Sequence, residues 1–443
     1  MIKNKFIYEN FFSVKDINLI LSDEEFINKI LYVELMLANA NYKLNIIPQK
    51  AFKDIKKAIS NFSINSNSIK NSVDISGIPI LGILKSLENR LDISNKQYLH
   101  FGATSQDILD TAVMLQIKDC KNILFDSIKK LSKDIYLLVA SNKNTLMVGR
   151  TRNMQATVTT FGLKAAYWLL PLLRHKTKLE YIFNNGFLAV QLGGAVGNLA
   201  LFKNLGLEVK KKLSELLNLN NSLVPWHAQR DNLADFAGIL SLITGSIGKM
   251  GKDILVLSRT EINEIEYFNA GKSSAMPHKN NPIKAELLVT LANLNANHLS
   301  IMHNTIIHEN ERDGISLAME WQTLSKMIKL CMASLHHADI CLNSLKINKD
   351  IMKKNLEKTN GFAMSDYYFN LLLKYYPYEV LSKKFPKILS KARSNKSYHL
   401  ANIIEKELGC NIFLNNNIEY NKHLGSNNKL ISLIIKEYKK HFK

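Results

Sequence analysis

The chain has 443 residues, of which 46% are hydrophobic and 22% are charged, and its formal net charge is +20. This composition is typical of a globular protein with a large core and excludes a disordered or fibrous chain. The lysines lie scattered among asparagines and isoleucines, which favours a solvated surface over a nucleic-acid site. Steering of acidic substrates by the positive field stays open.

The cysteines and the apolar runs indicate the cellular compartment of the protein. The four cysteines lie far apart and form no CxxC pair, which argues against a disulfide framework or a metal site and favours a reducing compartment. No stretch approaches 18 uninterrupted apolar residues, and the first residues carry no long apolar run. We therefore expect a cytoplasmic protein that contains no metal and contacts neither membrane nor nucleic acid.

Helical periodicity dominates the chain from its beginning. The first 98 residues predict short helices with an asparagine- and serine-rich break at 61–71. Long helices are then predicted at 107–140, 161–184, 282–308 and 319–345, because these stretches are poor in proline and their apolar residues recur with a helical period. Apart from short pieces near Gly193, no run alternates with the period of a strand. We therefore predict an all-α fold.

The clearest helix follows Pro225. Its apolar residues recur at spacings of three and four, as in the seam of a helix bundle: Leu233, Phe236, Leu240, Ile243, Ile247, Met250, Ile254 and Leu257. Glycines interrupt the same stretch at a cost of about 0.5–1 kcal/mol each, so we expect tight helix packing that offsets this cost. We predict three helical domains: an N-terminal domain at 1–98, a central bundle at 99–346 and a C-terminal cap at 347–443.

Polar clusters interrupt this helical sequence. In the segment 100–107, Thr104 or Ser105 can cap a helix and Asp107 can favour its first turn, but capping does not explain His100. The segment 149–157 suits either a turn into a helix or recognition of a carboxylate by its two arginines. The glycine-rich turn at 191–198 is weak evidence of any site.

The most informative cluster is the loop from Gly271 to Pro282, which reads GKSSAMPHKNNP. It is small and polar, contains two prolines and two lysines, and lies between strongly helical stretches. Such a loop suits capture of a negatively charged group. Pro282 is predicted to open a helix, and the positive end of that helix would favour the same anion.

Together these clusters resemble the signature regions of the fumarase/aspartase superfamily. The segments 102–107, 149–160 and 273–282 are similar to its regions one, two and three, and the third family form reads GSSxMPxKxNP, with Lys272 at the position of the first glycine. The resemblance covers about residues 10 to 440. It implies a homotetramer that needs no cofactor. Five helices of each subunit would form a central bundle of twenty helices, and three chains would contribute residues to each active site.

The resemblance also implies a chemistry. The family removes a proton α to a carboxylate and expels a group from the β carbon, or runs the reverse addition on a small polycarboxylate. By resemblance, Ser273 is the general base, and Lys279 binds the substrate carboxylate together with Asn281. A serine is a poor base unless its oxyanion is stabilised. The expected contacts to substrate are His100, Thr104, Ser105, Arg150, Gln155, Ser274, Met276, Asn281, Glu286 and Arg312.

Arg152 distinguishes two branches of the superfamily. Adenylosuccinate lyases carry GRTHxQ in region two, where the histidine is the general acid, whereas this chain reads GRTRNMQ. Bacterial 3-carboxy-cis,cis-muconate cycloisomerases resemble the chain better at HxGATSQDxxDTA, RTRxxQA, QxGGAxG and PWHAQRD. Met154 departs from the pattern of both branches. Glu286 either pairs with Arg152 or is a solvated helix residue.

The chemistry of the leaving group also favours a cycloisomerase over an adenylosuccinate lyase. An amine, as in adenylosuccinate, needs a proton donor, whereas the carboxylate that leaves in lactone opening is already stable as an anion. A cation at Arg152 can therefore replace the histidine. We predict a 3-carboxy-cis,cis-muconate cycloisomerase of protocatechuate breakdown (the β-ketoadipate pathway), with an adenylosuccinate lyase as the alternative and a non-catalytic relative as a third hypothesis.

Overall fold

The computed structural model describes residues 7–268, 271–272, 275–276, 278–394, 398–413 and 420–442. Helices dominate these residues, and the strands form only two-stranded sheets, which confirms the all-α prediction. By their contacts the residues form two compact units. Unit 1 comprises Met1–Ile128, His175–Gly245 and Thr290–His336, and unit 2 comprises Lys129–Arg174, Ser246–Val289 and His337–Lys443.

Five long helices each contribute a segment to both units. They are α7 (Ser105–Asn142), α8 (Phe161–Asn184), α10 (Asp231–Leu257), α11 (Ile283–Asn304) and α12 (Gly314–Asn343). Their bounds agree with the predicted helices within a few residues, because the apolar period and the prolines mark them clearly. The predicted boundaries of the three domains stay a prediction, since the compact units are defined by contacts and divide these same helices.

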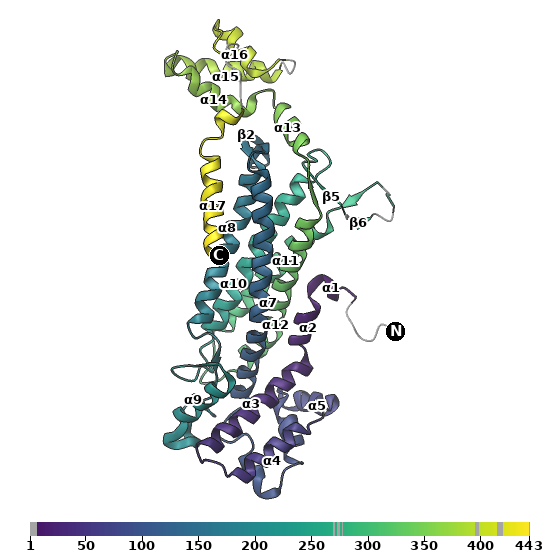
Figure 1. The fold of residues 1–443 in the computed structure, drawn as a ribbon, viewed down its shortest axis with the longest axis vertical. Coiled ribbons are helices and arrows are strands. Elements are labelled where there is room, and N and C mark those ends of the chain that lie inside the picture. The colour runs from purple at the N-terminus through teal and green to yellow at the C-terminus, as the bar shows by residue number, and fades with distance from the viewer. Residues whose placement is uncertain are drawn as a thin grey trace. The chain divides into compact units, whose positions relative to one another are not determined.

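Unit 1 also contains the short helices that precede α7. Its shorter elements are α1 (Glu9–Phe12), α2 (Lys15–Ile20), α3 (Asp23–Lys43), α4 (Gln49–Ser60), α5 (Ser66–Ser76), α6 (Ile80–Glu88), α9 (Gly206–Leu217) and the 3₁₀ helices η1 (Ile93–Tyr98) and η2 (Ala200–Leu205). Helix α3 contacts both α4 and α9, as Figure 1 illustrates. Ser22 caps α3 by accepting a hydrogen bond from the backbone N–H of Glu25. A single apolar core joins α3, α4, α5, α6 and α9 to the start of α7.

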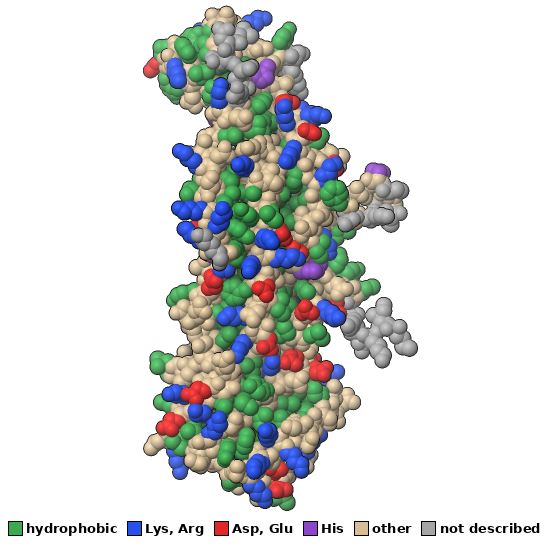
Figure 2. Space-filling view, in the orientation of Figure 1, with side chains coloured by type: hydrophobic (Ala, Val, Ile, Leu, Met, Phe, Trp, Pro, Cys, Tyr) green, Lys and Arg blue, Asp and Glu red, His purple; other side chains and the backbone are tan. Residues whose placement is uncertain are grey.

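Unit 2 contains the C-terminal helices. They are α13 (Lys349–Glu357), α14 (Ser365–Leu372), α15 (Tyr378–Ser394), α16 (Leu400–Leu408), α17 (Asn427–His441) and the 3₁₀ helices η3 (Phe362–Met364) and η4 (Tyr420–His423). Helices α14, α15 and α16 gather together in Figure 1 around an apolar core. Lys and Arg side chains are dispersed over the face seen in Figure 2, as expected for a solvated surface.

The strands are short. They are β1 (Leu146–Thr151), β2 (Met154–Thr160), β3 (Ala189–Val190), β4 (Asn220–Asn221), β5 (Ile265–Tyr267), β6 (Gly271–Lys272), β7 (Asn280–Asn281) and β8 (Leu345–Ile347). The pairs β1–β2, β5–β8 and β6–β7 are antiparallel, and β3–β4 is parallel. Strand β3 agrees with the strand pieces expected near Gly193.

The hairpin β1–β2 corrects one of the two alternatives for the segment 149–157, a turn into a helix, and no hairpin was expected there. Its turn consists of Arg152 and Asn153, whose φ angles of 52° and 65° are both positive. Positive φ at both positions is typical of the type I′ turn that joins tight hairpins. An arginine rarely adopts it, so the sequence carries no hairpin signal. Val148 and Val158 anchor the hairpin in the core of the C-terminal helices.

Helix α10 is a core helix, as its apolar seam predicted. The eight seam residues are at most 2% exposed. Among the described residues, α10 is the one helix long and apolar enough to cross a membrane by length and composition, but 61% of its most apolar window is buried within the fold. Close packing against α11 explains the glycine at position 251. A Cβ at Gly251 would lie 2.8 Å from the carbonyl oxygen of Ala285 and 2.9 Å from Cβ of Leu288, whereas a Cβ at Gly245 meets nothing within 4 Å.

We predict that Gly251→Ala lowers the free energy of unfolding by about 1–3 kcal/mol, because the added methyl group overpacks the contact between α10 and α11. Gly245→Ala is the matched control in the same helix and should stabilise by about 0.5–1 kcal/mol, since alanine favours the helix. Thermal or urea unfolding measures both. Equal effects of the two substitutions would contradict the close approach at Gly251.

Candidate active site

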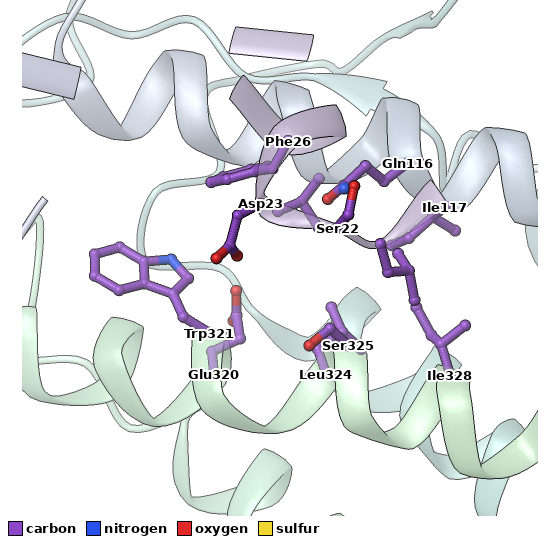
Figure 3. A pocket seen from close by; sticks show the side chains of 12 residues that line it. Ser22, Asp23, Phe26, Gln116, Ile117, Glu320, Trp321, Leu324, Ser325 and Ile328 are labelled. Carbon is purple, nitrogen blue, oxygen red and sulfur yellow. The ribbon is translucent and has the colours of Figure 1, made fainter. Parts of the chain in front are cut away.

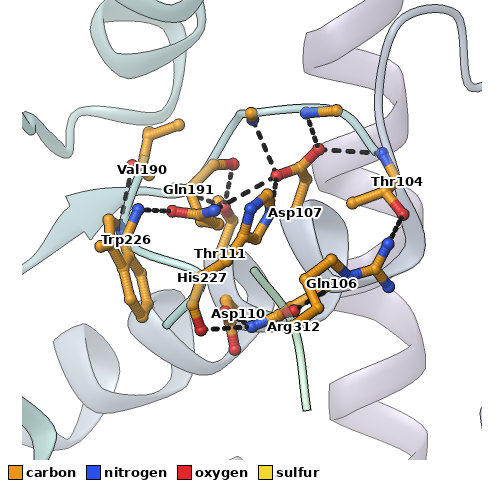
Figure 4. A network of polar contacts seen from close by, with 12 residues as sticks. Thr104, Gln106, Asp107, Asp110, Thr111, Val190, Gln191, Trp226, His227 and Arg312 are labelled. Carbon is orange, nitrogen blue, oxygen red and sulfur yellow. Dashed lines mark hydrogen bonds and ion pairs between the residues drawn. The ribbon is translucent and has the colours of Figure 1, made fainter. Parts of the chain in front are cut away.

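Asp107 is the centre of a buried polar network in unit 1, drawn in Figure 4. It lies in the first turn of α7 with no solvent exposure. Its carboxylate accepts hydrogen bonds from the backbone N–H groups of Thr104 at 2.8 Å and of Gly193 and Gly194 at 2.9 Å each. A further hydrogen bond of 2.7 Å joins it to Nε2 of His227. One carboxylate therefore holds three separate segments of the chain together.

The glycine-rich turn is shaped by the same contact. A Cβ at Gly193 would lie 2.8 Å from both Cε1 of His227 and Cβ of Pro225. Gly194 has a φ of 71°, which a residue with a Cβ rarely adopts. The backbone N–H groups of this turn thus hold the carboxylate of Asp107, and we call this arrangement the clamp on Asp107.

A second buried network surrounds Arg230. Its guanidinium forms two hydrogen bonds to Asp110, at 2.7 and 3.0 Å, and its Nε donates to Glu320 at 2.9 Å. The three residues are at most 3% exposed. Burial raises the pKa of Glu320, although Arg230 opposes that effect. Arg230 also lies over the ring of Trp226, 4.9 Å from its centroid. Because the charge of Arg230 is neutralised inside the protein, its role is structural.

Arg312 differs from Arg230 in its partners. Its Nη1 donates to the hydroxyl of Thr104 at 2.6 Å, and its Nε donates to Oε1 of Gln106 at 3.2 Å. Both of these hydrogen-bond partners, Thr104 and Gln106, are uncharged. Gln106 is in turn fixed by donating to the carbonyl oxygen of His227 at 2.9 Å. The structure therefore brings the predicted substrate residues Thr104 and Arg312 together, with a positive charge that a carboxylate can use.

His100 precedes this cluster in the chain and has a φ of 58°. Its Nδ1 lies 2.5 Å from Oε1 of the buried Glu34. Burial by itself lowers the pKa of His100, but the charge and hydrogen bond of Glu34, with a contribution from Asp107, raise it above its ordinary value. A protonated His100 is thereby favoured. Ser105 is the first residue of α7 and is half-buried.

The region-two residues lie on the hairpin of unit 2. Arg152 and Gln155 are exposed, Arg152 at the turn itself. Arg150 forms a bidentate pair with the buried Glu264, at 2.9 and 2.7 Å. Glu264 also accepts a hydrogen bond from Asn355 at 3.0 Å. This pairing positions the hairpin, and contact of Arg150 with substrate stays a prediction.

The signature loop is described in part. Ser273 and Ser274 lie outside the described residues. Strands β6 and β7 pair Gly271 with Asn281 and Lys272 with Asn280, so the described ends of the loop are held together. Met276 and Lys279 are exposed.

Glu286 is exposed in the first turn of α11. Its proposed pairing with Arg152 stays a prediction. Over the described residues, no group of three or more His, Cys, Asp or Glu side chains has the geometry to hold a metal ion.

A cavity of about 220 Å³ lies elsewhere in unit 1, between α3, α7 and α12. Figure 3 shows Asp23 and Glu320 among its lining residues, together with the rings of Phe26 and Trp321. None of the described residues that line it carries a positive charge, and Glu320 is already paired with Arg230. Within unit 1, Arg312 is therefore a better candidate than this cavity for binding an anion, and the region-two hairpin of unit 2 is a separate candidate.

Comparison with known proteins agrees with these signature regions. A family model described as "Lyase" matches residues 7–294. The chain belongs to this lyase family, within the fumarase/aspartase superfamily.

Several lyases are similar to the chain over most of its length. The N-acetyl-S-(2-succino)cysteine lyase of Enterococcus italicus is 35% identical over 81% of this chain and 79% of its own. The 3-carboxy-cis,cis-muconate cycloisomerase of Acinetobacter baylyi is 31% identical over 81% of each chain. Among solved structures, the 3-carboxy-cis,cis-muconate lactonizing enzyme of Pseudomonas putida has a TM-score of 0.90 at 26% identity, covering 99% of this chain and 100% of that one. The protein is thus an enzyme of the lyase and cycloisomerase kind.

Sequence reasoning missed the networks that hold the site. Asp107 was expected only to favour a helix end, and His227 and Arg230 belonged to a quoted motif without an assigned role. Their partners lie 86 to 120 residues away in the chain. An aspartate three residues after a helix cap, together with a glycine pair elsewhere in the chain, is the signal in the sequence that could have indicated the clamp.

We predict opposite effects for the two arginines of unit 1. Arg230→Met should lower the free energy of unfolding by about 3–5 kcal/mol, because it leaves two carboxylates buried without their cation. Arg312→Met should leave stability nearly unchanged but lower kcat/KM for a polycarboxylate by about 10- to 150-fold, the equivalent of a charged hydrogen bond worth about 1.5–3 kcal/mol. Unfolding curves and steady-state kinetics measure both. A fully active Arg312→Met would remove Arg312 from the site.

Proposed function

We propose that the protein catalyses reversible elimination on a tricarboxylate whose leaving group departs as a stable anion. The observation that carries this proposal is Arg152 at the tip of the hairpin, where adenylosuccinate lyases have a histidine acid. A guanidinium stays protonated in a protein and donates no proton at neutral pH. It stabilises negative charge, which is what a departing anion develops.

The basicity of the leaving group determines which substrates can react without a proton donor. A carboxylic acid has a pKa of about 4 and a thiol a pKa of about 8.5, so both leave readily as anions, whereas the N–H of a neutral amine does not ionise in water. A carboxylate or a thiolate can therefore leave without a proton, but an amide-like or amine nitrogen cannot. In the proposed step Ser273 removes the proton α to a carboxylate, Lys279 and Asn281 bind that carboxylate, and Arg152 faces the departing anion.

Lactonisation of 3-carboxy-cis,cis-muconate is the first candidate reaction. The substrate carboxylate forms a C–O bond across one double bond, and a proton is delivered to the carbon α to another carboxylate. The reverse step breaks the same C–O bond and releases a carboxylate. The motifs around Thr104, Arg152, Gly193 and His227 support this candidate, as does the similarity to the Pseudomonas putida lactonizing enzyme.

Cleavage of N-acetyl-S-(2-succino)cysteine is the second candidate. Here the C–S bond and a neighbouring C–H bond break, a double bond forms, and the products are fumarate and the thiolate of N-acetylcysteine. The 35% identity to the Enterococcus italicus lyase supports it. Both candidate substrates carry three carboxylates, which suits the cations Arg152, Lys279 and Arg312. The family resemblance implies a homotetramer that shares its active sites, and this stays a prediction.

The test is to incubate the pure protein separately with each substrate and with adenylosuccinate. We expect turnover of a tricarboxylate with an anionic leaving group, seen as loss of diene absorbance or release of fumarate, and no cleavage of adenylosuccinate. Turnover of adenylosuccinate alone would contradict the proposal.

Ser273→Ala is the control for the proton transfer. It should remove most activity with little change in stability. A residual rate within about tenfold of the unmodified protein, or about 1.4 kcal/mol in the barrier, would assign the proton transfer to another residue.

A further inference from the structure

A cavity of about 740 Å³ opens in unit 2 beside the region-two hairpin. Strand β2 and the turn before it form one wall, and residues near η3 and the end of α15 form the other. Its polar and aromatic lining includes Asn153, Gln155, Lys358, Asn360, Arg393 and Tyr398. The cavity thus joins a predicted substrate residue, Gln155, to residues of the C-terminal helices that no sequence motif indicated.

The walls of this cavity are firmly connected. The hydroxyl of Thr157 donates to the carbonyl oxygen of Ala363 at 3.0 Å, which ties β2 to η3. The backbone N–H of Leu400 donates to the carbonyl oxygen of Asn360 at 2.8 Å. Gly361 has a φ of 84°, and a Cβ there would lie 2.5 Å from the ring of His399. A site whose walls are fixed in advance binds a small ligand with less loss of entropy.

The charge of the cavity favours an anion. Lys358 and Arg393 contribute two cations, and none of the described residues that line it is acidic. Met154 and Tyr398 are 71% and 59% exposed and offer apolar surface beside these charges. A guanidinium and an ammonium group beside amide side chains can bind a carboxylate on a short carbon chain.

We propose that this cavity binds a carboxylate of the substrate that is remote from the reacting carbons, with Lys358 and Arg393 as specificity-determining residues. The proposal rests on the proposed function, since it takes Arg152 to face the leaving group. Arg152 directly precedes the lining residue Asn153, so a substrate whose leaving group lies at the turn can extend along the hairpin into the cavity. Tricarboxylates would then be preferred over dicarboxylates.

Kinetics test the proposal through Lys358→Gln, Arg393→Gln and the double variant. We expect KM for the accepted tricarboxylate to rise at least tenfold in the double variant, with kcat within about threefold, because a contact that is equally strong in the ground and transition states changes KM alone. A substrate that lacks the remote carboxylate should show no such rise. Lys384→Gln, an exposed lysine of α15 outside the cavity, is the matched control.

A binding measurement separates this proposal from the proposed function. Calorimetric titration with propane-1,2,3-tricarboxylate needs no turnover. We expect binding by the unmodified protein and by Lys384→Gln, and at least tenfold weaker binding by the double variant. Absence of binding, or equal binding by all three proteins, would overturn the cavity as a carboxylate site. Absence of turnover with intact, cavity-dependent binding would overturn only the proposed reaction.

Discussion

The buried carboxylate of Asp107 is the interaction on which the candidate site of unit 1 depends. It accepts backbone hydrogen bonds from Thr104, Gly193 and Gly194 and one from the ring of His227. Hydrogen bonds to an ionised acceptor are the stronger kind, and several of them can offset the cost of burying the charge. Through Thr104 the same carboxylate positions Arg312, so the clamp determines where a substrate anion would bind.

Four arginines of the two units differ in the groups that balance their charge: Arg150, Arg152, Arg230 and Arg312. Arg230 and Arg150 form bidentate pairs with buried carboxylates, Asp110 and Glu264, and such pairs fix geometry. Arg312 has uncharged partners, and Arg152 lies exposed at the turn of a hairpin. Arg312 belongs to unit 1 and Arg152 to unit 2. In the proposed reaction, a cation at Arg152 in place of a histidine acid stabilises a leaving group that departs as an anion.

The sequence predicted those parts of the fold that depend on local pattern. The five long helices follow from apolar periodicity, and helix α8 begins and ends at the predicted residues. The hairpin at Arg152 was missed because its turn places an arginine at positive φ and its strands do not alternate. The clamp on Asp107 could not be predicted, because Gly193 and His227 lie 86 and 120 residues away from Asp107 in the chain. The pairing of Arg150 with Glu264 could not be predicted either, because these two residues lie 114 residues apart. Such contacts follow from tertiary packing alone.

In the proposed reaction no protonated histidine assists the leaving group. The most direct test is the pH dependence of kcat in the direction of elimination, measured with the tricarboxylate that the protein accepts. His100 is itself held protonated by Glu34, so the measurement uses the His100→Gln variant. An arginine stays protonated throughout, so kcat of this variant should not fall between about pH 6 and pH 8. A fall in kcat of the variant through this range, in which a histidine loses its proton, would show that a histidine assists the leaving group.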